Sequence, residues 1–370
     1  MSKINDLIKK LCPNGVEYKK LEDCCNILDN KRKPVSKGVR ENGEYPYYGA
    51  NGIQDYINDY IFDGEYVLVG EDGSVQTANG TPVVNWAVGK IWVNNHAHII
   101  EEIDGVSLRY LYHYLQIVDV KDLIHGNIPK LNQGDFRNIK IAIPPLEVQE
   151  EIVRILDKFG ELEAELEAEL EARKNQYEFW RSKVISKSNK KVKIGEICDV
   201  ITGGEVPEDT IKGNEPDETH KYAVYGNGKE IYGYTNTYRI DKDSTVISSI
   251  GANTGAIYFH KAFFTPIVRL KVLVPKDNVN PRYLYHALQT VNFGSKSGSV
   301  PNLNANDIKN TELPYFEIDE QSKIVEALDK FDILINDISE GLPAEIDLRR
   351  KQYEYYRNKL LSFEELSVSE

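Results

Sequence analysis

The 370-residue chain has little of what secreted, zinc-binding or membrane-spanning proteins depend on. Its four cysteines, Cys12, Cys24, Cys25 and Cys198, show no CxxC spacing and are too few for a disulfide framework or a tetrahedral zinc site. No apolar run approaches the ~20 residues that cross a bilayer. Residues 1–10 alternate charged and apolar side chains and lack the core of a signal peptide. We therefore expect a cytoplasmic protein.

Catalytic motifs are also missing. The chain has no GxGxxG after a predicted strand, no GxxxxGK[ST], no HExxH and no GxSxG. On a strand, His96 and His98 would share a face, but a metal site usually needs three or more suitable ligands. We expect packed or surface histidines, no bound metal, and a solvated acidic turn at Gly70-Glu71-Asp72-Gly73. These absences predict a non-catalytic protein.

The net charge of −13 argues at first against a nucleic-acid partner. Its distribution weakens that objection. Residues 1–145 and 188–314 carry net charges of −3 and +1, whereas residues 146–187 and 315–370 carry −4 and −7. The acidity therefore lies on the two segments that we predict to be helical, and the remaining parts can approach DNA.

An internal duplication organises the whole chain. The blocks starting at Lys20, Tyr48, Ile128, Gln149 and Gln176 recur, in the same order, at Lys193, Tyr225, Val300, Gln321 and Gln352, with offsets of 172 to 177. Five ordered blocks at a nearly constant offset indicate two copies of one plan. We predict a globular domain at 1–145, a helix at 146–187, a second globular domain at 188–316, and a second helix at 317–370.

The two predicted domains combine strands and helices. Alternating runs at 66–69, 90–93 and 269–274 predict strands, and 108–117 and 281–291 predict helices, the latter with Pro281 at its first position. Tyr48 to Gly52 and Tyr225 to Gly228 look like tight turns with positive φ, and the Pro-x-Leu-Asn motifs at 129–132 and 301–304 like turns before the last strand. The expected fold class is α+β (mixed α/β).

Long helices follow each domain. After Pro144-Pro145, side chains of one face recur at spacings of three and four residues: Val148, Ile152, Ile155, Phe159, Leu162, Leu166, Leu170, Arg173, Tyr177, Trp180 and Val184. This heptad pattern, repeated from Ile324, predicts two helices packed as an antiparallel coiled coil with pseudo-twofold symmetry. Phe159 precedes Gln176 by 17 residues, but Phe331 precedes Gln352 by 21. One helical turn, or a break at 341–343, must absorb the difference.

Residues 162–172 repeat Leu-Glu-Ala-Glu. As local structure, this is a solvated stretch of good helix formers. One copy more or less would change the helix by ~6 Å and about 40° of rotation, so the repeat can also adjust spacing. Its glutamates predict that it does not lie against phosphates.

Two similar domains on a rigid helical spacer suit a two-part target on duplex DNA. Asn and Gln recognise adenine edges, and Lys and Arg recognise guanine or phosphate. The candidate DNA-binding residues lie in the predicted loops, where ordinary turn residues are the alternative interpretation: Lys31, Arg32, Lys33, Arg40, Tyr48, Asn51, Gln54, Gln76, Thr77, Lys130, Asn132, Gln133, Tyr225, Asn227, Lys229, Asn253, Thr254, Lys296, Ser297, Asn302 and Asn304.

Several of these motifs resemble one family. Residues 11–21, 143–157 and 173–179, with the second copies at 321–331 and 348–355, are similar to specificity subunits of type I restriction–modification systems. The resemblance covers essentially the whole chain. The Leu-Glu-Ala-Glu copies resemble the tetrapeptide repeats of one branch, with glutamate where threonine is expected.

The resemblance implies that each globular domain recognises one half of a bipartite DNA sequence and that the helices set the spacing. It further implies docking of two modification subunits, which bring S-adenosylmethionine and methylate adenine. Two restriction subunits that use ATP and Mg²⁺ are an optional addition. No cofactor is expected on this chain itself.

Two other hypotheses stay open. The chain is alternatively a coiled-coil scaffold that binds proteins without recognising DNA, in which case its interactions should lack steep salt dependence. A free-standing DNA methyltransferase or nuclease is disfavoured because the cofactor loop and the catalytic motifs are missing.

Overall fold

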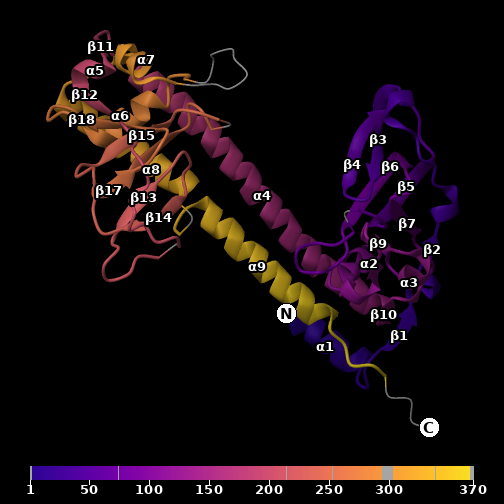
Figure 1. Cartoon of the computed structure of the whole chain (residues 1–370). Coiled ribbons are helices and arrows are strands. Elements are labelled where there is room, and N and C mark those ends of the chain that lie inside the picture. The colour runs from indigo at the N-terminus through magenta and orange to yellow at the C-terminus, as the bar shows by residue number, and fades with distance from the viewer. Residues whose placement is uncertain are drawn as a thin grey trace. The chain divides into compact units, whose positions relative to one another are not determined.

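The computed structural model describes residues 2–73, 75–213, 215–251, 253–293, 303–337 and 339–366. The chain divides into two compact units (Figure 1). Unit 1 comprises Met1–Leu166 and Ile346–Glu370, and unit 2 comprises Glu167–Glu345. No helix among the described residues has the length and apolarity needed to cross a membrane.

Unit 1 contains a mixed domain and parts of two long helices. Its helices are α1 (Ser2–Leu11), α2 (Leu108–Leu115), α3 (Gln133–Asn138), the first part of α4 (Leu146–Ile185), most of α9 (Leu342–Leu361), and short 3-10 turns at Leu21–Asp23, Asp29–Lys31, Lys37–Val39 and Lys121–Leu123. Its strands are β1 (Glu17–Lys20), β2 (Asn26–Ile27), β3 (Asn42–Gly49), β4 (Gly52–Ile57), β5 (Phe62–Gly70), β6 (Val84–Val93), β7 (Ala97–Glu101), β8 (Ile124–His125), β9 (Lys130–Leu131) and β10 (Lys140–Ile143).

A six-stranded sheet in the order β2-β7-β5-β6-β3-β4 forms the centre of this domain. All its neighbouring pairs are antiparallel except β3 and β6, which are parallel. Because side chains alternate along a strand, β5 serves two cores. Val67 and Val69 pack in the cluster that includes Leu111 of α2, and Tyr66 and Leu68 pack in the opposite cluster. The buried run 66–69 predicted from the sequence is thus a central strand covered on both faces.

Unit 2 repeats this plan with fewer and shorter strands. Its helices are α5 (Ile194–Ile197), α6 (Pro281–Leu288), α7 (Ala305–Asn310), α8 (Ile318–Asn336) and the second part of α4. Its strands are β11 (Lys191–Lys193), β12 (Cys198–Thr202), β13 (Tyr222–Tyr225), β14 (Ile231–Thr235), β15 (Ser244–Ser248), β16 (Ile257–His260), β17 (Phe264–Pro266), β18 (Leu270–Pro275) and β19 (Glu312–Pro314). They form sheets in the orders β12-β18-β15-β16, β14-β13-β17 and β11-β19.

Local signals in the sequence explain the paired helices α2 and α6. Ser107 caps α2 by accepting from the amide of Tyr110, and Asn280 caps α6 by accepting from the amides of Arg282 and Tyr283. Pro281 occupies the first turn of α6, where a missing N–H costs nothing. Both predicted helices are confirmed, and both end two or three residues before the predicted position.

The long helices pack within each unit. In unit 1 the ring of Phe159 stacks on Tyr356, with centroids 5.4 Å apart, and Glu163 accepts from Arg350 at 2.8 Å. Residue numbers rise along α4 as they fall along α9, so the two helices are antiparallel. In unit 2, Tyr177 of α4 stacks on Phe331 of α8. The predicted fold class, α+β domains with antiparallel long helices, is confirmed.

Two details of the sequence prediction are wrong. The predicted heptad face includes Trp180, but its side chain is 41% exposed, whereas Tyr177, Leu170 and Val184 of that face pack in the core of unit 2. The second Tyr-Gly motif does not form a tight positive-φ turn: Gly52 has φ +92°, whereas neither Gly226 nor Gly228 has a positive φ. Five residues separate β13 from β14, so that turn needs no left-handed glycine.

The four-residue mismatch between the helical copies is absorbed by a break. α4 continues from Leu146 to Ile185, whereas the second copy ends α8 at Asn336 and starts α9 at Leu342. Gly341 lies within the break, and a Cβ there would stand 2.6–2.8 Å from the carbonyl oxygens of Ile333, Leu334 and Asp337. Only glycine fits without moving backbone, and Pro343 then falls in the first turn of α9.

We predict that Gly341→Ala destabilises the end of α8. The methyl group would overlap three backbone oxygens, which must move apart at a cost of about 2 kcal/mol, within the range for overpacking. Hydrogen exchange of peptides from residues 330–345 should rise, while peptides from unit 1 stay unchanged. Gly160→Ala is the control, because a Cβ at Gly160 meets nothing within 4 Å. Unchanged exchange in Gly341→Ala would contradict the proposed fit.

Candidate nucleic-acid interface

Five loop segments of unit 1 lie against one another. Lys33 N donates to Val93 O at 3.2 Å, Asn94 N to Tyr48 O at 3.1 Å, and Glu71 N to His96 O at 2.8 Å. Gly73 N donates to Pro129 O and Leu131 N to Glu71 O, at 3.0 and 2.9 Å. We call these segments, residues 29–33, 48–54, 71–73 with 75–77, 93–96 and 129–133, the loop region of unit 1. It contains most of the DNA-binding residues predicted in the first half of the chain.

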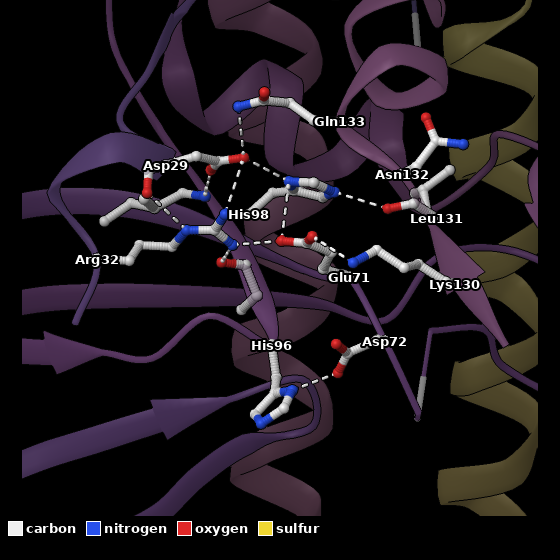
Figure 2. Close-up of polar contacts among 12 residues, drawn as sticks. Asp29, Arg32, Glu71, Asp72, His96, His98, Lys130, Leu131, Asn132 and Gln133 are labelled. Atoms are coloured by element: carbon white, nitrogen blue, oxygen red, sulfur yellow. Dashed lines mark hydrogen bonds and ion pairs between the residues drawn. The ribbon is translucent and has the colours of Figure 1, made fainter. Parts of the chain in front are cut away.

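Charged side chains, all but Lys130 largely buried, join these segments (Figure 2). His98 Nδ1 lies 2.7 Å from Asp29 Oδ2, and Arg32 Nη1 lies 2.5 Å from Glu71 Oε2. Lys130 Nζ lies 3.1 Å from the other Glu71 oxygen, and Gln133 Nε2 donates to Asp29 Oδ2 at 3.2 Å. We call Asp29, Arg32, Glu71, His98 and Lys130 the ion network. It connects four of the five segments, because Glu71, Lys130 and Arg32 belong to three of them and His98 lies two residues after the end of the fourth.

The hydrogen-bond geometry assigns the proton positions in this network. Both nitrogens of His98 face acceptors, the Asp29 carboxylate at 2.7 Å and Leu131 O at 2.9 Å, so both must donate. The ring also stacks on Phe136 at 4.1 Å. Burial opposes ionisation of Asp29, but the hydrogen bond from His98 and the charge of Arg32 hold the pKa of Asp29 below its ordinary value. Asp29 is therefore ionised at neutral pH.

The sequence interpretation of residues 70–73 as a solvated acidic turn is wrong for Glu71, which is 7% exposed. A charged group at that depth needs partners, and Arg32 and Lys130 supply them. Asp29, Glu71 and His98 offer oxygen and nitrogen atoms within 4.8 Å of one another, a spacing that a metal ion could use. Because side-chain cations already balance the carboxylates, these residues do not require one. His96 lies at the surface, bound to Asp72, and shares no site with the buried His98.

The structure divides the predicted DNA-binding residues into groups. Within the described part of the chain, six are exposed and have no side-chain hydrogen bond or ion pair: Lys31, Lys33, Asn51, Gln76, Lys229 and Asn253. Others bond within the fold or are buried: Arg32, Arg40, Tyr48, Gln54, Thr77, Lys130, Asn132, Gln133, Tyr225, Asn227, Thr254 and Asn304. Lys296, Ser297 and Asn302 lie outside the described residues. DNA contact stays a prediction for all of them.

The asparagines of the two Pro-x-Leu-Asn motifs have a structural role. Asn132 Oδ1 accepts from the amide of Asp135 at 3.0 Å, and Asn304 Oδ1 from the amide of Asp307 at 2.9 Å. Each asparagine therefore caps a short helix, α3 or α7, that the sequence analysis did not predict. The last strand of each domain, β10 or β19, follows directly after that helix.

The corresponding loops of unit 2 are held by neutral groups. Ser248 Oγ donates to Asn227 Oδ1 at 2.6 Å, and Asn227 Nδ2 donates to Ile250 O. Leu303 N donates to Ser249 O at 2.8 Å, in the place of the Leu131–Glu71 bond of unit 1. Nearby, His260 stacks on Tyr225 at 3.7 Å, and burial lowers its pKa to about 4, so it stays uncharged. We call residues 225–229, 248–251 with 253–254, and 267–269 the loop region of unit 2.

Sequence reasoning missed Arg269. It is exposed, makes no side-chain hydrogen bond or ion pair with another described residue, and has φ +81°, a conformation that costs energy outside glycine. Its backbone carbonyl accepts from Ser249 N at 3.1 Å, so it belongs to the loop region of unit 2. A single sequence carries no signal for that conformation. We add Arg269 to the candidate DNA-contacting residues.

A second feature that the sequence analysis missed, a repeated five-residue segment, could have been found in the sequence. Residues 109–113 and 282–286 both spell Arg-Tyr-Leu-Tyr-His, at an offset of 173. Asp29 and His98, in contrast, are 69 residues apart, and no repeated motif links them. Their pairing could therefore not have been predicted from the sequence.

We predict that Asp29→Asn loosens the loop region of unit 1. Removing the charge takes from His98 the carboxylate at 2.7 Å and leaves Arg32 with Glu71 alone, at a cost of about 3 kcal/mol for a broken buried pair. Because folding lowers the Asp29 pKa, its contribution is present above the unfolded-state value and is lost as the pH falls through the folded-state value. The difference is therefore largest at neutral pH. Hydrogen exchange of peptides around residues 26–34 and 96–101 measures it.

Asp72→Asn is the matched control. Asp72 makes the same type of contact, to His96, at a partly exposed position where an ion pair contributes about 1 kcal/mol or less. Equal effects of the two substitutions would show that burial of the network is unimportant.

The comparisons with known proteins agree on one family. A model of the type I restriction modification DNA specificity domain matches residues 13–172 and again 186–348. A putative type I restriction enzyme specificity subunit of Haemophilus influenzae is 36% identical, over 96% of this chain and 98% of the relative. The EcoR124I/EcoR124II specificity subunit of Escherichia coli is 33% identical, over 69% of this chain and 71% of the relative.

Solved structures agree at the level of the fold. The S subunit of a type I restriction-modification system from M. genitalium has a TM-score of 0.60 at 15% identity, covering 94% of this chain and 96% of that one. A chain from a structure of type I R-M complex assembly and conformational transition has a TM-score of 0.55 at 15% identity, covering 94% and 98%. The doubled domain match and the near full-length relative confirm the resemblance and the prediction of a non-catalytic subunit: the chain belongs to the family of type I restriction–modification specificity subunits.

Proposed function

We propose that this chain recognises a bipartite DNA sequence, with one half bound by the loop region of each unit. The observation that carries the proposal is the repeated arrangement of exposed, unpaired basic and amide side chains on loops that internal bonds hold in place. Unit 1 presents Lys31, Lys33, Asn51 and Gln76, and unit 2 presents Lys229, Asn253 and Arg269.

The chemistry of these side chains suits DNA. Lysines neutralise phosphates without sequence preference, whereas asparagine and glutamine pair with the edge of adenine, and arginine with guanine or phosphate. A fixed loop backbone lowers the entropy lost when such side chains bind. The ion network of unit 1 and the Asn227–Ser248 contacts of unit 2 provide that fixed backbone.

The helices suit protein partners instead. Glutamates of the Leu-Glu-Ala-Glu repeat are exposed, apart from Glu163, which pairs with Arg350. Exposed apolar side chains on the same helices offer a docking surface in each unit, Leu348 and Tyr355 of α9 in unit 1 and Phe179 and Trp180 of α4 in unit 2. We propose that two modification subunits bind there and bring S-adenosylmethionine for adenine methylation. Two restriction subunits with ATP and Mg²⁺ complete the optional assembly.

Footprinting with purified modification subunits tests the bipartite model. We expect two short protected segments separated by an unprotected spacer, at a site whose adenines are methylated in the host genome only when this gene is present. One uninterrupted short site, or no site, would contradict the model. Binding that is insensitive to salt would favour the protein-binding scaffold, since phosphate contacts release counterions.

We predict that the double substitution Lys31→Ala, Lys33→Ala weakens DNA binding by the complex and lowers the slope of log K against log salt by about 2, the value for two lost phosphate contacts. The loss should concern one half of the target. Lys19→Ala, Lys140→Ala is the control, because it removes the same charge from the paired strands β1 and β10, away from the loop region. Equal salt slopes for the two double variants would exclude phosphate contacts at Lys31 and Lys33.

A further inference from the structure

The repeated Arg-Tyr-Leu-Tyr-His segments supply two identical side-chain clusters. In unit 1, Arg109 Nε donates to Asp157 Oδ1 at 2.9 Å, and His113 Nε2 lies 2.8 Å from the same oxygen. The other ring nitrogen of His113 lies 3.2 Å from the hydroxyl of Tyr353. Arg109 and His113 belong to α2, Asp157 to α4, and Tyr353 to α9, so the cluster joins the globular part of unit 1 to two long helices.

Unit 2 repeats each of these contacts. Arg282 Nε donates to Asp329 Oδ1 at 3.0 Å, His286 Nε2 lies 2.7 Å from that oxygen, and His286 Nδ1 lies 2.9 Å from the hydroxyl of Tyr177. Here the arginine and histidine come from α6, the aspartate from α8 and the tyrosine from α4. We call each set of four residues a Tyr–His–Asp–Arg cluster. Two copies with the same partners, in regions that differ elsewhere, indicate a common role.

The direction of the hydrogen bonds follows from the acceptors. The aspartate can only accept, so the histidine Nε2 carries a proton and donates to it. Burial lowers the pKa of His113 and of His286, although the neighbouring aspartates oppose this, so each ring is neutral and its Nδ1 accepts from the tyrosine hydroxyl. A tyrosine without its hydroxyl would leave a buried nitrogen without a partner, because His113 is 2% exposed and His286 is 0% exposed.

Each tyrosine comes from the helix that, in the sequence, follows the globular domain of the other unit. Tyr353, which closes the cluster of unit 1, lies on the helix that follows the second globular domain. Tyr177, which closes the cluster of unit 2, lies on the helix that follows the first. The aspartates differ, because Asp157 and Asp329 each follow their own domain.

We propose that Tyr353 and Tyr177 are positioning residues for DNA recognition, each fixing the globular part of its own unit on the helices. Tyr353 thereby controls discrimination at the half-site of the first domain, and Tyr177 at that of the second. The proposal rests on the bipartite function given above. Its reason is geometric: a single hydrogen bond to the ring fixes the tilt of α2 or α6, and a small tilt displaces the loops that must meet base edges.

The test uses Tyr353→Phe and Tyr177→Phe in the full complex with modification subunits. The probes are duplexes with the mapped bipartite site, intact or with one base pair changed in either half, and the measurement is the ratio of methylation kcat/KM for intact and changed DNA. We expect each variant to lower this ratio about threefold to tenfold at one half-site, the factor that one ordinary hydrogen bond is worth. The other half-site should keep its ratio.

Half-sites are assigned to domains by footprinting the Lys31→Ala, Lys33→Ala protein, whose protection should weaken at the half bound by the first domain. Tyr353→Phe should affect the half-site that this variant affects, and Tyr177→Phe the other one. If both tyrosine variants lower both ratios equally, or if each affects the half-site of the domain that precedes it in sequence, the proposal is wrong. If the wild-type complex discriminates at neither half-site, the bipartite function itself fails, which is a distinguishable result.

Tyr110→Phe and Tyr283→Phe are the matched controls. They remove hydroxyls of α2 and α6 that donate to Ala142 O and Pro314 O, at 2.8 and 2.7 Å, within the globular parts. These variants should lower the melting temperature as much as the test variants do, without changing either discrimination ratio. A change in the ratios as large as in the test variants would show that the effect is general destabilisation.

Discussion

One carboxylate oxygen in each unit holds the globular part on the helices. Asp157 Oδ1 and Asp329 Oδ1 each accept from an arginine and a histidine of the short helix α2 or α6. Burial opposes the charge of Asp329, but His286 and Arg282 outweigh it and lower its pKa to about 2. The carboxylate therefore stays ionised at every pH where the protein works. Since α2 and α6 pack directly on the central strands, this contact helps to hold the sheets, and with them the loops, on the helices.

The two units hold their loops in place by different kinds of interaction. Unit 1 buries an ion network, in which desolvation of Asp29 and Glu71 is offset by Arg32, Lys130 and His98. Unit 2 uses neutral bonds among Asn227, Ser248 and Ser249. The backbone bond from Leu131 or Leu303 is the same in both. The contacts of Asp157 and Asp329 are the same in both units, whereas the interactions that hold the loops differ. The exposed loop side chains can therefore differ between the units while the fold stays the same.

The parts of this protein that the sequence predicted are those encoded by local patterns. The helix predicted at 146–187, the helix start at Pro281 and the break predicted at 341–343 follow from spacing within about ten residues, and the duplication follows from five ordered blocks at offsets of 172 to 177. The functional surface follows from long-range pairing instead. Arg32 was a candidate for DNA contact as reasonable as Lys31, until Glu71, 39 residues away, accepted its guanidinium. A polar loop residue points inward when it has a partner of this kind elsewhere in the chain. Neither the periodicity nor the composition of the sequence shows which residues have such a partner.

The Leu-Glu-Ala-Glu repeat lies on α4 between a residue of the first cluster and a residue of the second. Asp157, which belongs to the cluster of unit 1, and Tyr177, which belongs to that of unit 2, lie on this one unbroken helix. Residues 162–172 fall entirely between them. One additional copy would move Tyr177 by ~6 Å and about 40° relative to Asp157, because a helix is rigid along its axis. On the return path, the break at Gly341 lies between Asp329 and Tyr353. The repeat thus lies between the residues that α4 contributes to the two clusters, so a change in its length would change their separation along this helix.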